Sequence, residues 1–75
     1  MITLNGKESK TYANLNELLE ENKFRRELIA VEINGEIISK ADFDTTPIND
    51  GDVVEVVHFM GGGAFAKQMR IVYPR

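Results

Sequence analysis

The stretch that decides the fold is DGDVVEVVHFMGGG, residues 50–63 of a chain of 75 residues. Residues 53–59 are almost unbroken in apolar side chains, which is typical of a central strand covered on much of both faces. The strand runs directly into three glycines, Gly61, Gly62 and Gly63. Residues without side chains after a buried strand form a thin extension that can enter a narrow slot on another protein. We therefore predict that this chain acts through its backbone at this end, and not through a side chain.

Two hairpins and a helix precede this strand. Asn5-Gly6 and Asn34-Gly35 each supply the two positive-φ positions of a tight hairpin turn. Asn14, with Glu17 three residues later, resembles a capping box and predicts a helix whose buried stripe is Leu15, Leu18 and Leu19. The predicted strands occupy residues 2–4, 7–12, 28–33, 36–39 and 52–59. An irregular helical turn is predicted at residues 41–43, before the last strand.

The order ββαββ-loop-β predicts an α+β fold of the β-grasp (ubiquitin-like) type, a mixed sheet of about five strands with one helix packed across it. The first and last strands lie parallel at its centre. The leucine stripe then packs on Ile2, Leu4, Val31, Ile33, Val54 and Val56. Strand alternation sends Val57 and Phe59 to the opposite face. We predict that this pair is exposed and, with Met60, docks a partner.

Size and composition exclude several classes of protein. A chain of 75 residues makes one small domain, with no room for a deep catalytic cleft. The absence of cysteine excludes a disulfide scaffold, a thiolate metal site and a cysteine nucleophile, and it suits a reducing cytoplasm. Neither a signal peptide nor a membrane-spanning stretch is evident, so we expect a cytoplasmic protein without membrane contact.

The charge is unevenly distributed. Residues 1–63 contain all 12 acidic side chains against six basic ones, whereas residues 64–75 add Lys67, Arg70 and Arg75 and no acid. An acidic body repels phosphate backbones and suits a basic protein partner, so we predict no nucleic-acid binding.

Side-chain chemistry offers little else. His58 is the only histidine, and a lone imidazole at a strand end indicates a surface or boundary residue. The aspartates between residues 42 and 52 lack the glycine and closing glutamate of a calcium loop. Gly61 to Ala66 matches a dinucleotide fingerprint in letters only, because too few residues follow for the required helix and strand. We predict no metal and no cofactor.

Four segments together resemble the ThiS family of thiamine-biosynthesis sulfur carriers. They are Asn5-Gly6-Lys7, the leucine helix with Glu20, residues 30–36 (AVEINGE), and residues 50–63. The resemblance covers residues 1–63 and implies a ubiquitin-like carrier that is not itself an enzyme. It implies that an ATP-dependent activating enzyme (an adenylyltransferase) adenylates the terminal glycine, which is converted to a thiocarboxylate. Thiazole synthase then receives the sulfur.

On this resemblance Gly63 is the attachment position, and Gly61 and Gly62 give access to the partner's active site. A free carboxylate is needed, yet residues 64–75 follow Gly63. We interpret them as a pro-segment that a protease removes. Two other interpretations stay open: a strand, residues 69–73, that pairs with a sheet edge, or an artefact of how the gene's end is assigned.

Two alternatives to the thiamine role remain. One is the same carrier chemistry in cysteine, homocysteine or molybdopterin synthesis. The other is a β-grasp interaction module that never reacts. They differ in whether Gly63 becomes a free C-terminus. The sequence does not indicate an oligomeric state.

Overall fold

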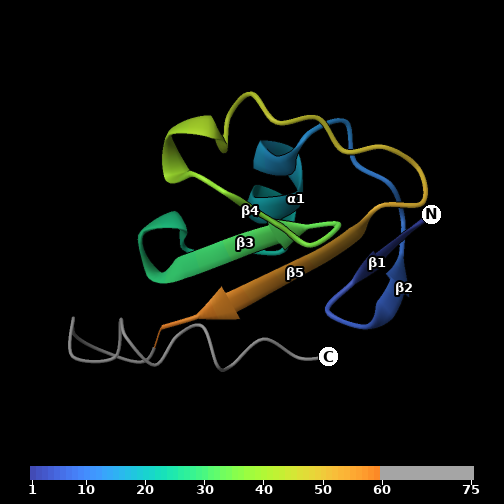
Figure 1. Cartoon of the computed structure of the whole chain (residues 1–75), viewed down its shortest axis with the longest axis horizontal. Coiled ribbons are helices and arrows are strands. Elements are labelled where there is room, and N and C mark those ends of the chain that lie inside the picture. Colours follow the sequence, from blue (N-terminus) through green and yellow to red (C-terminus); the bar gives the residue numbers. More distant parts are fainter. Residues whose placement is uncertain (60–75) are drawn as a thin grey trace.

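A computed structural model describes residues 1–59 of the chain. Five strands, one α-helix and two short 3₁₀ helices follow one another within these residues (Figure 1). In chain order they are β1 (Ile2–Leu4), β2 (Lys7–Ser9), α1 (Leu15–Glu21), η1 (Arg26–Leu28), β3 (Ile29–Ile33), β4 (Glu36–Ile38), η2 (Lys40–Asp42) and β5 (Val53–His58). No helix in this described part is both long and apolar enough to cross a bilayer.

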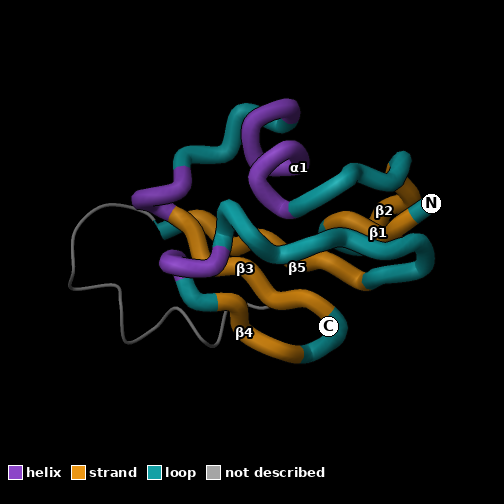
Figure 2. The backbone as a smooth tube through the Cα atoms, turned by 90° about the horizontal axis from the view of Figure 1, so that it is seen from above, coloured by secondary structure: helices purple, strands orange, loops and turns teal. Residues whose placement is uncertain are grey.

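The five strands form one mixed sheet in the order β2-β1-β5-β3-β4. β1 and β5 are parallel neighbours, with Thr3 opposite Val53, whereas the other pairs are antiparallel. β5 therefore lies at the centre, as its apolar composition predicts. The predicted β-grasp fold is confirmed, and α1 lies across one face of the sheet (Figure 2).

Both hairpin turns have the backbone that their Asn-Gly pairs predict. Asn5 and Gly6 have φ values of 51° and 82°, and Asn34 and Gly35 have 53° and 86°. Asparagine and glycine adopt this left-handed region at the lowest cost, which explains why the chain reverses at these two points. The second strand is shorter than predicted, since it ends at Ser9 rather than Tyr12.

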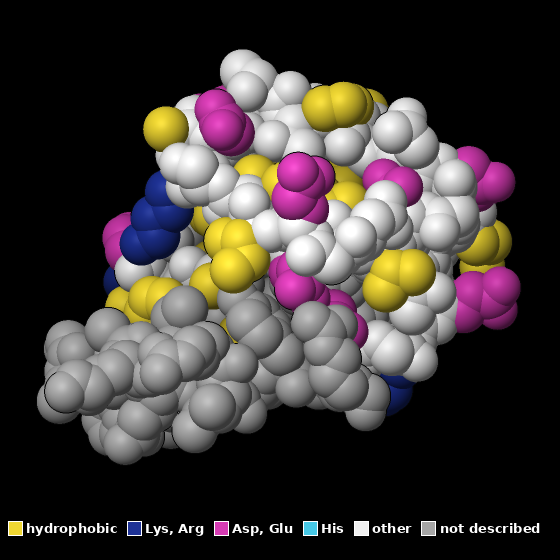
Figure 3. Space-filling view, in the orientation of Figure 1, with side chains coloured by type: hydrophobic (Ala, Val, Ile, Leu, Met, Phe, Trp, Pro, Cys, Tyr) yellow, Lys and Arg dark blue, Asp and Glu magenta, His cyan; other side chains and the backbone are white. Residues whose placement is uncertain are grey.

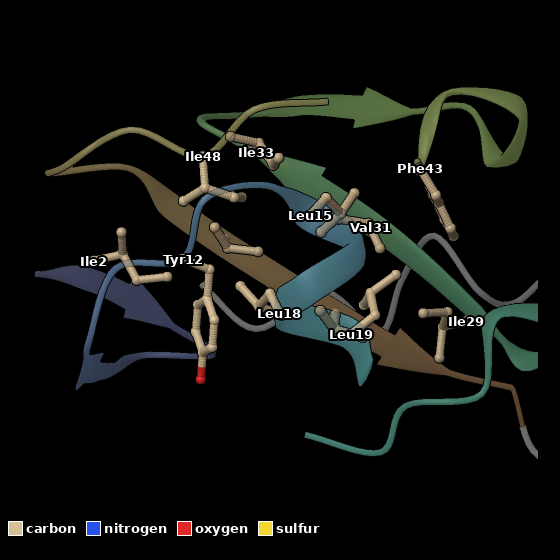
Figure 4. Packing of buried hydrophobic residues seen from close by; sticks show 12 residues of the cluster. Ile2, Tyr12, Leu15, Leu18, Leu19, Ile29, Val31, Ile33, Phe43 and Ile48 are labelled. Atoms are coloured by element: carbon tan, nitrogen blue, oxygen red, sulfur yellow. The ribbon is translucent and has the colours of Figure 1, made fainter. Parts of the chain in front are cut away.

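The helix starts at its capping box. The Asn14 side chain accepts a hydrogen bond from the Glu17 N–H (2.9 Å), and the Glu17 carboxylate accepts one from the Ala13 N–H (2.8 Å). Leu15, Leu18 and Leu19 are completely buried against the sheet, as the spacing predicts (Figure 4). Four further residues complete the core from outside the predicted set: Tyr12, Ile29, Phe43 and Ile48.

Candidate functional site at the end of strand β5

The side chains of β5 point alternately to the two faces of the sheet. Val54 and Val56 point into the core beneath α1. Val53, Glu55 and Val57 point to the other face, as strand alternation requires. Which face each residue uses was therefore predictable from the apolar pattern.

The prediction that Val57 and Phe59 are exposed is wrong. Val57 is only 6% exposed, although it lies outside the core cluster, and Phe59 is half-buried. Alternation determines the direction in which a side chain points, but it does not determine whether that face is covered. The docking role of these two residues stays a prediction.

The end of β5 is held firmly to the sheet. His58 is the last residue paired with β3, opposite Ile29, and the Phe59 N–H donates to the Leu28 carbonyl (2.7 Å). The His58 ring also packs on the Phe24 ring, with 5.6 Å between centroids. The described chain thus ends next to η1. The predicted site residues Met60, Gly61, Gly62 and Gly63 lie outside the described residues.

Two asparagine side chains, one from each hairpin turn, accept hydrogen bonds from the backbone of β5, and we call these contacts the clasp. Asn5 Oδ1 accepts from the Val56 N–H (2.7 Å), and Asn34 Oδ1 accepts from the Val53 N–H (2.9 Å). Asn34 also donates to the Asp52 carboxylate (2.9 Å). The two turn residues therefore extend the hydrogen bonding of the sheet along the strand that leads to the glycines. The Asn-Gly signal had indicated only turns.

Basic side chains gather on the side of the molecule where β5 ends (Figure 3). Lys23, Arg25 and Arg26 lie in or just before η1, and Lys40 Nζ donates to the Glu27 carbonyl (3.1 Å). Arg26 is fixed by Asp44 (2.6 Å). This group was not predicted, although the sequence Lys23-Phe24-Arg25-Arg26 signals a local concentration of positive charge. We call these four basic residues the positive rim, because they place positive charge beside the end of β5 on an otherwise acidic domain.

Two ion pairs formed by residues outside η1 and β5 shift the pKa values of Lys10 and Asp50. A hydrogen bond to Glu21 raises the pKa of Lys10, and a hydrogen bond to the N-terminal ammonium lowers the pKa of Asp50. Neither group faces the end of β5. Among residues 1–59, no three His, Cys, Asp or Glu side chains are placed together to hold a metal ion.

A small β-grasp domain whose central strand leads into a run of glycines belongs to the class of ubiquitin-like proteins. The sheet order, the single helix across it and the fixed end of β5 define that class here. Within it, the model of the ThiS family matches residues 2–63. The chain belongs to the ThiS family.

Similar proteins agree with this assignment. The chain is 38% identical to the sulfur carrier protein ThiS of Bacillus subtilis over 66 residues, which cover 84% of this chain and all of the relative. It is 42% identical to ThiS of Thermus thermophilus, with 84% of this chain and all of that protein covered. A protein of Paramagnetospirillum magneticum named thiazole synthase is 37% identical over 65 residues, which make up 20% of its length.

A solved structure supports the fold directly. The crystal structure of the thiamine biosynthesis protein ThiS from Geobacter metallireducens superposes with a TM-score of 0.71 at 43% sequence identity. The match covers 83% of this chain and 97% of that one. The family match ends at Gly63, so residues 64–75 follow the region shared with the family.

Proposed function

We propose that this chain is a sulfur carrier that is adenylated and thiocarboxylated at Gly63 and donates sulfur to form the thiazole of thiamine. The observation that carries the proposal is the family match, which ends at Gly63, four residues after Phe59, whose N–H is hydrogen-bonded to the Leu28 carbonyl. The relatives named sulfur carrier protein match over their whole length.

The chemistry explains why glycine is required. A terminal carboxylate, with a pKa near about 3.5, is ionised at neutral pH and is a poor electrophile. Attack of its oxygen on the α-phosphorus of ATP releases pyrophosphate and leaves an acyl adenylate. Hydrosulfide then attacks the glycine carbonyl carbon and AMP departs, which gives the thiocarboxylate and releases one proton. A Cβ at Gly62 or Gly63 would obstruct the approach to that carbon.

In this proposal the domain positions the terminal glycine, and partner enzymes carry out the catalysis. An activating enzyme binds ATP and performs the adenylation. Thiazole synthase receives the sulfur, and the thiazole synthase relative supports this pairing because part of its own chain resembles this one. Val57, Phe59 and Met60 form the docking contact. No bound cofactor enters the cycle, and we place the carrier in the cytoplasm with its partners.

The segment 64–75 must leave before the cycle begins. While the Gly63–Ala64 peptide bond is intact, an amide replaces the carboxylate and cannot be adenylated. Hydrolysis of that bond by a protease adds one water and frees the Gly63 carboxylate. Residues 1–63 are then the carrier domain, and residues 64–75 are the removable extension.

The test is an intact mass measurement after incubation with cell extract, followed by ATP, an activating enzyme and a sulfur source. We expect loss of the 12 residues after Gly63 and then the mass increase for exchange of one oxygen by sulfur. A Gly62→Val/Gly63→Val variant should not acquire sulfur, whereas a Glu20→Ala variant, changed at an exposed position of α1 and with an intact end, should. An unchanged full-length mass in cells would favour a non-reacting interaction module.

The receiving pathway needs its own measurement. Purified thiocarboxylated protein supplied to thiazole synthase should lose its sulfur as thiazole product forms. If the sulfur moved instead to a cysteine, homocysteine or molybdopterin precursor, the carrier chemistry would stand and the thiamine assignment would fall.

A further inference from the structure

The face of the sheet opposite α1 has an uneven exposure. Strand registers place eight side chains on this face, which we call the open face: Thr3, Glu8, Ala30, Glu32, Ile37, Val53, Glu55 and Val57. Among residues 1–59, no helix lies over it, because α1 and the two 3₁₀ helices are on the other side or at the rim (Figure 2). A sheet with antiparallel pairs can leave one face to solvent, so any burial on this face indicates a local cover.

Part of the open face is nevertheless buried. Ile37 is 63% exposed and Val53 is 43% exposed, whereas Val57 is 6% exposed and Glu32 is 5% exposed. Val57 lies opposite the small Ala30 of β3, and β1 pairs with β5 only at Val53 and Val54. The covered part of the open face is thus the part near the end of β5.

The charges of the open face and of residues 64–75 are complementary. Three of the eight open-face residues are glutamates, and none is lysine or arginine. Residues 64–75 contain three basic side chains, no acidic one, and five large apolar ones: Phe65, Met69, Ile71, Val72 and Tyr73. A cationic, apolar segment suits a surface of glutamates and valines.

The chain length also permits the contact. Phe59 is fixed beside Leu28 at the end of β5, so the segment leaves the sheet next to Val57. After residues 60–63, the following 12 residues extend up to about 40 Å, and β5 itself is about 20 Å long. A segment attached so closely has a roughly millimolar effective concentration, so even a weak contact is populated.

We propose that residues 64–75 bind the open face of their own domain over Val57 and Glu32. The segment then blocks the carrier twice, because it converts the Gly63 carboxylate to an amide and covers the face that carries the docking residue Val57. Cleavage after Gly63 removes both blocks in one step. This consequence for docking rests on the proposed function, whereas the contact itself does not.

A paramagnetic label tests the contact on the full chain. The chain has no cysteine, so Gln68→Cys gives a single attachment site for a nitroxide and leaves all three basic residues in place. Amide signals of Glu32, Glu55 and Val57 should lose intensity relative to the reduced nitroxide, and those of Leu18 and Leu19 in α1 should not. The same label on a Lys67→Glu/Arg70→Glu/Arg75→Glu chain should broaden Glu32 and Glu55 much less, because only the covalent attachment then keeps the label near the end of β5.

A matched charge control separates a specific contact from net charge. Lys7→Glu/Lys23→Glu/Arg25→Glu changes the charge equally on exposed positions of the domain and should keep the broadening. Broadening spread evenly, confined to β2 or β4, or absent would overturn the proposal. Broadening of isotope-labelled, nitroxide-free protein by nitroxide-labelled protein would assign the face to a second copy and also overturn it.

The outcome is independent of sulfur chemistry. If the intact mass shows thiocarboxylate but the open face is not broadened, the contact proposal fails and the carrier stands. If the face is broadened but no sulfur is acquired, the carrier proposal fails and the contact stands.

Discussion

Replacing Asn5 by glycine should destabilise the domain by removing one side of the clasp on β5. Asn5 Oδ1 accepts a 2.7 Å hydrogen bond from the Val56 N–H, and Val56 is only 6% exposed. Glycine keeps the positive φ of 51° at this position without strain, so the folded backbone is unchanged. Glycine also gives the unfolded chain more conformational freedom, which adds to the loss. The perturbation removes the acceptor and leaves a largely buried donor unpaired.

The expected loss is about 1–2 kcal/mol, because a net hydrogen bond contributes about 1 kcal/mol and an unpaired buried donor costs about 1–3 kcal/mol when water is fully excluded. For a domain of this size, that loss lowers the melting temperature by about 4–16 °C. Thermal and urea unfolding followed by circular dichroism measure it. Hydrogen exchange at the Val56 amide should become faster.

Asn5→Asp is the matched control, since it keeps an oxygen acceptor and tolerates the left-handed backbone. Its loss should stay below about 0.5 kcal/mol. If the glycine and aspartate variants melted at the same temperature with equal Val56 exchange, the clasp would have no energetic role and the reasoning would be refuted.

Three further changes test other parts of the structure. Asn34→Asp places a second carboxylate against Asp52, to which the Asn34 side chain donates a hydrogen bond at 2.9 Å. The variant should be destabilised at pH 7 and should regain stability as the pH falls toward about 5, because one of the two carboxylates is then protonated. A loss of stability in urea unfolding that did not depend on pH would contradict this. A hydrogen bond to the N-terminal ammonium lowers the pKa of Asp50, so the contribution of this ion pair to stability is present above about pH 4 and is lost as the pH falls through the lowered pKa. The melting temperatures of wild type and Asp50→Asn should differ at pH 7 and converge in acid, once the Asp50 carboxylate is protonated in the folded state as well. Leu18→Ala, at a position with no exposure, should cost about 2–5 kcal/mol in urea unfolding, whereas Ile37→Ala at 63% exposure should stay within about 0.5 kcal/mol, and equal costs would contradict the assigned core.

The position of the positive rim beside the end of β5 could not be predicted from the sequence. Lys23, Arg25 and Arg26 are close in sequence, but their position next to the exit of β5 follows from the Phe59–Leu28 hydrogen bond and the pairing of Ile29 with His58. Lys40 comes to the same place from η2. Contacts between such distant segments leave no local signal in the sequence.

By itself, the sequence determined the local structure of this protein. Asn-Gly pairs set the two hairpin turns through their left-handed φ, the Asn14 and Glu17 side chains began the helix, and the spacing of Leu15, Leu18 and Leu19 chose its buried face. Each of these signals acts over a few residues, because backbone dihedrals and side-chain periodicity are local properties. The family resemblance, carried by four such segments in order, is confirmed by the match to residues 2–63.

Only the tertiary structure decided which surfaces are covered and what the turn side chains bind. Phe43 and Ile48 enter the core from an irregular loop, and Val57 is buried on a face that alternation alone predicted to be open. Asn5 reaches Val56, which lies 51 residues further along the chain. Burial and long-range hydrogen bonds depend on segments that meet only after the chain has folded, and no short pattern encodes that meeting.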